Sequence, residues 1–202
     1  MDVIRVTDRL DPHEVLEGYR KGVFPMGYLD APVISWHLPE KRGVLPLDQF
    51  HTSRSLAHTL KQNRFTVTLD TAFEAVMRAC ASRGEDEADN TWITEEIIAV
   101  YLQLHREGHA HSLEVWVDGV LAGGTYGIHI GGAFFAESKF HTVRDMSKVA
   151  LASLVSHLNK QGFQLLDVQY LTPHLSQFGV IEIDRNAYYW RLREALKLTC
   201  RF

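Results

Sequence analysis

The sequence contains little cysteine and no long apolar run. Its two cysteines, Cys80 and Cys200, stand far apart in a chain of 202 residues. Such a pair argues against both a disulfide framework and a zinc ribbon, since these need several cysteines at short spacings. No apolar stretch approaches the thickness of a bilayer, and the N-terminal residues lack the apolar segment of a signal peptide. We therefore expect a cytoplasmic protein with no membrane partner.

Excess positive charge is missing as well. Lysine and arginine together number 21 against 25 aspartate and glutamate residues, which gives a formal net charge of −4. Because this overall charge repels phosphate, any contact with RNA must come from a local basic patch. Apolar residues make up 46% of the chain and aromatic residues 10%, which is enough for a substantial core and argues against disorder.

Helices are predicted where capping residues precede apolar positions at helical spacing. Asp11 and Pro12 begin the first helix and Gly22 ends it, while Asp70 is expected to cap the third. The charged segment 84–90 is expected to be a solvated loop. The predicted helices cover residues 13–21, 53–62, 71–82, 94–107, 147–160 and 185–197.

Strands are predicted from alternating or continuous apolar residues between turn signals. Glycine-containing turns join three of them into a meander, which a helix and one more apolar strand follow. Residues 23–28 are predicted to form a turn, because Phe24 precedes a proline. This order predicts an α+β fold with a mixed sheet flanked by helices. The predicted strands cover residues 34–37, 64–69, 112–117, 120–129, 133–140 and 163–170.

The last of these strands carries a carboxylate and an amide two residues apart, Asp167 and Gln169. Because strand side chains alternate, both should point to the same face, where a charge on Asp167 can orient the amide of Gln169. Taken alone, this is a weak motif, because a carboxylate that pairs at a strand end accounts for it more simply. The same holds for Glu137, which shares a strand face with Lys139 and could form an ordinary ion pair with it.

Two other groups of residues suggest a metal site and a catalytic triad, but their surroundings do not fit either. A helix end at Gly108 separates the three histidines at 105, 109 and 111, and neither thiols nor a metalloprotease spacing accompany them, so capping and surface roles are favoured over a metal site. A serine, a histidine and an aspartate occur at 138, 141 and 145, but the glycine-flanked turn of a nucleophile elbow does not surround the serine.

A series of short motifs runs through the chain in a fixed order. It comprises G-V-F-P-M at 22–26, W-H-L-P-E-K-R at 36–42, H-S-L-E-V-W at 111–116, G-G-T-Y-G at 123–127, F-F-A-E-S-K-F at 134–140, S-K at 147–148 and D-V-Q at 167–169. In order and spacing this series resembles the leucyl/phenylalanyl-tRNA–protein transferase family, and the resemblance covers nearly the whole chain.

The resemblance implies a small N-terminal domain over residues 1–62 and a GNAT-like (acetyltransferase-type) catalytic domain over 63–202. It implies an enzyme that moves leucine or phenylalanine from the 3′ end of aminoacyl-tRNA to the N-terminal α-amino group of proteins that begin with arginine or lysine. The new residue marks those proteins for degradation. Neither a cofactor nor a metal is implied, and we expect a monomer.

The resemblance also assigns residues to roles. Asp167 and Gln169 are the expected catalytic pair, and Glu137 is expected to hold the aminoacyl group or the ester end of the tRNA. Trp92 and Met26 are expected to stack on the terminal adenosine, whereas ordinary packing is favoured for Trp36 and Trp116. The remaining expected contacts are a donor pocket of Thr125, Phe134, Lys139, Leu151 and Leu166, and a tRNA patch of Arg54, Lys61 and Arg64.

The chain departs from the family pattern in this donor pocket. Lys139 replaces a methionine, and Thr125 stands at a position that is usually apolar. An unpaired ammonium against leucine or phenylalanine costs several kcal/mol, so either Lys139 turns out or pairs with Glu137, or the donor specificity differs. One rival is an acetyl-CoA-dependent acetyltransferase, but residues 141–148 lack the glycine-rich turn that holds a pyrophosphate. A second rival is a protein that binds tRNA or protein N-termini without catalytic activity. The presence of Asp167 and Gln169 disfavours it.

Overall fold

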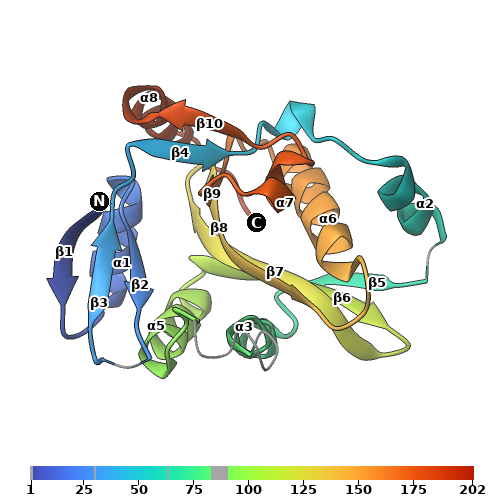
Figure 1. Cartoon of the computed structure of the whole chain (residues 1–202), viewed down its shortest axis with the longest axis horizontal. Coiled ribbons are helices and arrows are strands. Elements are labelled where there is room, and N and C mark those ends of the chain that lie inside the picture. The colour runs from blue at the N-terminus through green and yellow to red at the C-terminus, as the bar shows by residue number, and fades with distance from the viewer. Residues whose placement is uncertain (1, 30, 63, 83–90) are drawn as a thin grey trace.

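The structure is a computed structural model that describes residues 2–29, 31–62, 64–82 and 91–202 (Figure 1). The segment 84–90, expected to be a loop, lies outside the described residues. Among the helices described, none is long and apolar enough to cross a membrane. The helices are α1 (Pro12–Arg20), α2 (Arg54–Gln62), α3 (Phe73–Ala81), α5 (Glu95–Arg106), α6 (Met146–Lys160), α7 (Pro173–Ser176) and α8 (Arg185–Leu196), with a 3-10 turn, η1, at Leu47–Gln49.

A small antiparallel sheet is formed by the N-terminal part of the chain. Its strands β1 (Val3–Thr7), β2 (Phe24–Gly27) and β3 (Ile34–His37) lie in the order β1-β3-β2. Residues 23–28 were predicted to form a turn, and this prediction is wrong, because four of them form β2. Pro25 is tolerated there because β2 is an edge strand, so a missing N–H on its outer side breaks no ladder bond.

The larger sheet has seven strands in the order β10-β4-β9-β8-β7-β6-β5. β8 and β9 are parallel and the other neighbours are antiparallel, which confirms the predicted α+β class with a mixed sheet. The strands are β4 (Lys41–Val44), β5 (Thr66–Leu69), β6 (Ala110–Val117), β7 (Val120–Ile130), β8 (Ala133–His141), β9 (Leu165–Gln169) and β10 (Ile181–Asp184).

The pairing of β4 shows where the chain passes from the small sheet to the larger one. β4 pairs with β9 on one side and with β10 on the other, so residues 41–44 belong to the larger sheet. The strand pairing therefore separates the two sheets between β3 and β4, ahead of the expected domain boundary at residue 62.

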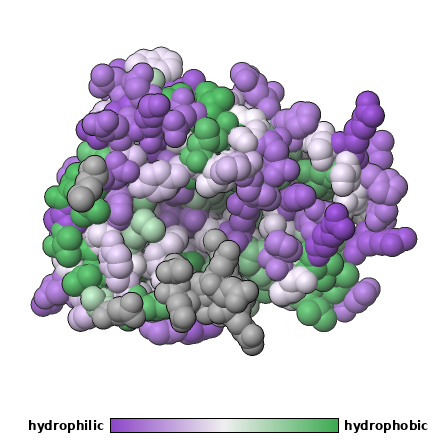
Figure 2. Space-filling model, viewed as in Figure 1, coloured by the Kyte–Doolittle hydropathy of each residue, from purple (hydrophilic) through white to green (hydrophobic). Residues whose placement is uncertain are grey.

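The core lies on both faces of the larger sheet. α6 covers one face, and α3 and α5 cover the other (Figure 1). The α3 side is continuous with the apolar residues beneath the small sheet, such as Tyr19 and Trp36, so the two sheets share one hydrophobic core there. The α6 side forms a second cluster with Leu45, Phe134 and Leu166. Figure 2 shows a mostly polar surface on the face it presents, with apolar residues scattered among the polar ones.

Two aspartates show where capping signals in the sequence succeed and where they fail. Asp11 caps α1 as predicted, since its carboxylate accepts from the backbone N–H groups of His13 and Glu14. Asp70 does not cap α3. It has a φ of 56°, and its carboxylate accepts from the N–H of Ser112 at 2.8 Å and lies 2.7 Å from Nδ1 of His111. Asp70 therefore joins the end of β5 to β6.

Candidate active site

A cleft of about 1080 Å³ opens between the small sheet, β8 and the chain that follows β9. β8 contributes both acidic and basic side chains, and β2 contributes an apolar wall. The residues that line the cleft are Phe24, Pro25, Met26, Ala79, Ser82, Trp92, Glu137, Lys139, Phe140, His141, Thr142, Ser147, Val168, Gln169, Tyr170, Thr172, His174 and Leu175.

Glu137 reaches this cleft from an irregular point in β8. Tyr126 of β7 pairs with Ser138 and Gly127 pairs with Ala136, so Glu137 is the extra residue of a β-bulge. A bulge bends its strand and changes the direction of the side chain that it carries. Such irregularities often occur beside active sites, because they aim one side chain where regular alternation would not.

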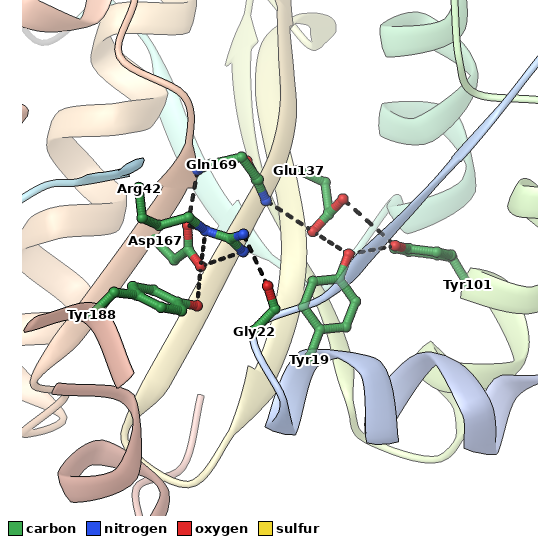
Figure 3. Close-up of polar contacts among 8 residues, drawn as sticks. All are labelled: Tyr19, Gly22, Arg42, Tyr101, Glu137, Asp167, Gln169 and Tyr188. Carbon is green, nitrogen blue, oxygen red and sulfur yellow. Dashed lines mark hydrogen bonds and ion pairs between the residues drawn. The ribbon is translucent and has the colours of Figure 1, made fainter. Parts of the chain in front are cut away.

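Two buried tyrosines hold the carboxyl group of Glu137 (Figure 3). Tyr19 of α1 donates to Oε1 at 2.6 Å, and the hydroxyl of Tyr101 of α5 lies 2.8 Å from that of Tyr19 and 3.5 Å from Oε2. Burial raises the pKa of Glu137 to about 8, and the negative charge of Asp167 acts in the same direction, whereas the hydrogen bond from Tyr19 opposes it. With this pKa the carboxyl group of the unliganded protein is largely protonated at pH 7.

Asp167 lies beneath the cleft floor and is not one of the residues that line it. Its side chain is fully buried and pairs with Arg42, whose Nε and Nη2 both donate to the carboxylate at 2.8 to 3.0 Å. The hydroxyl of Tyr188 of α8 donates to Oδ2 at 2.6 Å. Arg42 also donates through Nη1 to the carbonyl of Gly22 at 3.0 Å, so β4, β9, α8 and the end of α1 meet at this carboxylate.

Gln169 connects this buried cluster to the cleft. Its backbone N–H donates to Oδ1 of Asp167 at 2.8 Å, and its side-chain Nε2 donates to Oε1 of Glu137 at 3.3 Å (Figure 3). Its φ of 57° lies in the left-handed region, which interrupts the regular alternation of β9. The contact between Asp167 and Gln169 is thus made through the backbone, whereas the sequence predicted a contact with the side-chain amide.

The other residues of the expected donor site are divided between the cleft and the core. Met26, Trp92 and Lys139 line the cleft together with Glu137 and Gln169. Thr125 is buried and donates its hydroxyl to the carbonyl of Ser138. The remaining three are buried in the cluster between the sheet and α6, and they are Phe134, Leu151 and Leu166.

The expected tRNA-binding residues lie away from this cleft. Arg54 and Lys61 are exposed on α2, and Arg64 is exposed just before β5. β5 is the edge strand at the opposite end of the larger sheet from β4 and β10 (Figure 1). Arg64 and Trp116 line a second depression there, of about 980 Å³.

Sequence reasoning did not assign a role to Tyr19, Tyr101 or Tyr188, and it treated Arg42 as a motif residue without a partner. A signal for Tyr19 was present, because it falls on the apolar face of α1 with Val15 and Leu16, and a phenol buried there requires a hydrogen-bond partner. Capping and surface roles were expected for the histidines, but His111 is buried, with its Nδ1 2.7 Å from Oδ2 of Asp70. His105 lies 2.8 Å from the carbonyl of Ala110, and the described residues contain no cluster of metal-ligating side chains.

Comparison with known families identifies two matching models. The model of the leucyl/phenylalanyl-tRNA protein transferase matches residues 44–193, and the model of its N-terminal domain matches residues 8–40. The two matches meet between residues 40 and 44, where the strand pairing also separates the two sheets.

Two curated relatives match almost the whole chain. A leucyl/phenylalanyl-tRNA–protein transferase of Chlorobaculum parvum is 51% identical over 183 residues, which cover 91% of this chain and 94% of the relative. A transferase of the same name from Gloeobacter violaceus is 47% identical over 193 residues, which cover 96% and 97%.

A solved structure resembles the fold at low sequence identity. The crystal structure of FemX superimposes with a TM-score of 0.54 at 10% identity, over 85% of this chain and 66% of that one. This likeness concerns the fold alone. The small N-terminal sheet and the mixed sheet between helices agree with the expected α+β class.

Proposed function

Because the chain belongs to the leucyl/phenylalanyl-tRNA–protein transferase family and is thus an aminoacyltransferase, we propose that it acts on proteins that begin with arginine or lysine. It moves leucine or phenylalanine from the 3′ end of aminoacyl-tRNA to the α-amino group of those proteins. The added residue marks them for degradation. No cofactor takes part in the proposed reaction.

The observation that supports this proposal is the meeting of Glu137 and Gln169 in one cleft beside Trp92 and Met26. A carboxyl group and an amide in contact provide polar groups for an ester and an amine. The aromatic and thioether side chains that line the same cleft provide surfaces on which a base can stack, at ~1–3 kcal/mol per base for an aromatic ring. An aminoacylated adenosine carries both kinds of group.

The proposed reaction requires little from the protein beyond the correct placement of the two substrates. The donor is an activated ester, and the correct placement of two reactants can contribute on the order of 7–11 kcal/mol. An α-amino group with a pKa of about 7.7–8.0 is roughly one tenth neutral at pH 7, so a strong base is unnecessary. The amine nitrogen forms a bond to the carbonyl carbon, the ester carbon–oxygen bond breaks, and the departing ribose oxygen gains the proton that the amine loses.

Each expected site residue has a place in this scheme. The side-chain Nε2 of Gln169 is turned to Glu137, so its amide oxygen is the acceptor that it presents to the hydrogen of the attacking amine. Glu137 holds the aminoacyl end of the donor. Thr125, Phe134, Leu151 and Leu166 are buried and do not line the cleft, so in this proposal they shape the donor pocket from the core, and Lys139 borders it. Arg54, Lys61 and Arg64 bind the tRNA backbone.

Replacement of Gln169 tests the assignment. We expect Gln169→Ala to lower the transfer of leucine from leucyl-tRNA to a peptide with N-terminal arginine by about 100-fold or more, with tRNA binding nearly unchanged. Gln177→Ala is the matched control, because Gln177 is exposed on the turn after α7 and is not among the cleft residues. Near-normal transfer by Gln169→Ala would contradict the role of Gln169, and transfer from acetyl-CoA instead would contradict the choice of donor.

A further inference from the structure

The carboxylate of Asp167 is surrounded by donors from the protein itself. Oδ1 accepts from Nε of Arg42 and from the backbone N–H of Gln169, and Oδ2 accepts from Arg42 and from the hydroxyl of Tyr188. The side chain has no exposed surface. A carboxylate in this position does not reach a substrate in the cleft, so its effect on the reaction passes through the groups that it binds.

One of those groups is the backbone of Gln169, whose conformation is unusual for its residue type. A left-handed backbone costs an L-residue other than glycine roughly 1–2 kcal/mol, and Gln169 adopts it with a φ of 57°. The hydrogen bond from its N–H to Asp167 offsets this cost, because a bond to a charged acceptor contributes about 1.5–3 kcal/mol. The conformation turns the side chain toward Glu137.

Neighbouring backbone leaves little room for a different arrangement. Gly43 of β4 packs against the chain just after Gln169, where a Cβ on Gly43 would lie 2.7 Å from the carbonyl carbon of Tyr170. The N–H of Tyr170 donates to the carbonyl of Val168 at 2.7 Å, which closes a tight turn around Gln169. The direction of the Gln169 side chain therefore depends on Asp167 and on the strand beside it.

Asp167 is itself held from two sides. The guanidinium carbon of Arg42 lies 4.8 Å from the centre of the Tyr188 ring and 4.6 Å from that of Phe24, so Arg42 is enclosed between two aromatic rings. Tyr188 also packs against the end of α1, because a Cβ on Gly22 would lie 2.9 Å from its ring. The ring of Tyr188 thus fixes Arg42, and its hydroxyl fixes Asp167.

We infer that Tyr188 and Arg42 are positioning residues for the transfer reaction, which hold Gln169 in its reactive direction through the carboxylate of Asp167. This inference rests on the proposed role of Gln169. Tyr188 comes from a helix that lies outside the cleft, and its hydroxyl contributes to the rate without contact to either substrate.

A double-mutant cycle with Tyr188→Phe and Gln169→Ala tests this inference. Tyr188→Phe removes one hydroxyl and keeps the ring against Arg42 and Gly22. Displacement of a reacting group by about 1 Å costs up to about 100-fold in rate, so we expect kcat to fall by about 10- to 100-fold, while KM for leucyl-tRNA changes less than about twofold. In the Gln169→Ala background the same substitution should change kcat little, because the group that it positions is gone.

Tyr189→Phe is the matched control. Tyr189 is the next residue of α8, is 37% exposed and is not one of the donors to Asp167, which are Arg42, Gln169 and Tyr188, so the loss of its hydroxyl should leave kcat and KM unchanged. Thermal unfolding of each variant establishes that it is folded. If Tyr188→Phe does not fold, Arg42→Lys, which keeps the charge but not the two-nitrogen fork, enters the same cycle.

The possible outcomes separate this inference from the proposed function. An equal loss of kcat on Tyr188→Phe in the wild-type and Gln169→Ala backgrounds would overturn it, as would an unchanged kcat or an effect on KM alone. A wild-type protein that transfers neither leucine nor phenylalanine would instead contradict the proposed function. A wild-type protein that transfers normally, with a loss on Tyr188→Phe only where Gln169 is present, supports both.

Discussion

Burial is the main cause of the raised pKa of Glu137. Its carboxyl group contacts two phenols and one amide, and these offset only part of the cost of removing a negative charge from water. Its pKa is therefore raised to about 8. A neutral carboxyl group can donate as well as accept a hydrogen bond, which suits a site that must hold an ester.

The raised pKa has a consequence for stability. The folded pKa of about 8 lies above the value of an unfolded chain, so between the two values the native state binds a proton that the unfolded state has released. We expect the free energy of unfolding of the wild type, relative to Glu137→Gln, to fall by on the order of 1 kcal/mol per pH unit from about pH 5 to pH 8. Urea unfolding of both proteins at each pH measures this difference. If the free energies of unfolding of the two proteins changed with pH in parallel, the expectation would be contradicted.

Lys139 lines the cleft at the border of the expected donor pocket. An ammonium near an apolar donor lowers affinity because its desolvation is costly, so we expect Lys139→Met to raise kcat/KM for leucyl- and phenylalanyl-tRNA by on the order of tenfold over an acidic aminoacyl-tRNA. Lys160→Met, at the end of α6 and outside the cleft, is the control. The same ranking of donors in wild type and Lys139→Met would rule out a specificity role for this lysine.

At the scale of secondary structure, α1 links the helix-capping signals of the sequence to the site. Its N-terminus is set by Asp11, its buried face brings Tyr19 to Glu137, and Gly22, just beyond its C-cap, supplies the carbonyl that Arg42 binds. A loss of stability in this helix therefore affects both sides of the cleft floor.

The cap of α1 can be tested by itself. Asp11→Ala removes the acceptor for the N–H groups of His13 and Glu14, so we expect it to lower the free energy of unfolding by ~1 kcal/mol. Asp8→Ala is the matched control, because the side chain of Asp8 is exposed and has only a long contact of 3.9 Å with Arg9. Chemical denaturation compares the two. Equal stability of the two variants would show that the cap contributes nothing.

Short strands were harder to predict than helices. The predicted helices correspond to α1, α2, α3, α5, α6 and α8 with ends shifted by at most two residues, because caps and the apolar period are local properties. β1, β2, β4 and β10 were not predicted. Each has only four or five residues and is a strand because a distant segment pairs with it, as β10 does with β4.

At the scale of the whole molecule, the basic residues expected to bind tRNA lie on α2 and just before β5, the edge strand opposite β10, whereas the cleft is lined from β2, β8 and the chain that follows β9. A tRNA whose 3′ end enters the cleft is long enough to extend beyond it, so the two surfaces can act together in the proposed complex. With a net charge of −4, the protein depends on local basic residues for this contact.

Replacement of Arg54, Lys61 and Arg64 by alanine should weaken leucyl-tRNA binding and reduce its dependence on salt. Each lost phosphate contact lowers the slope of log K against log salt by about 0.7–0.9, so three lower it by about 2–3. Filter binding between 50 and 200 mM salt, roughly the range over which such slopes are resolved, measures this. A triple alanine variant at Arg193, Lys197 and Arg201 removes the same charge near the C-terminal end as a control. An unchanged slope would place the RNA surface elsewhere.

The sequence by itself determined the helices other than α7, the meander of β6 to β8, the α+β class and the motifs that indicated the family, because caps, turns and apolar periods act over a few residues. The tertiary structure decided what those motifs do in space. The bulge at Glu137 and the left-handed backbone of Gln169 both break the alternation from which their directions were predicted. Arg42 and Tyr188 meet Asp167 across 125 and 21 residues of sequence. Such contacts depend on which segments the fold brings together, and no local pattern encodes them.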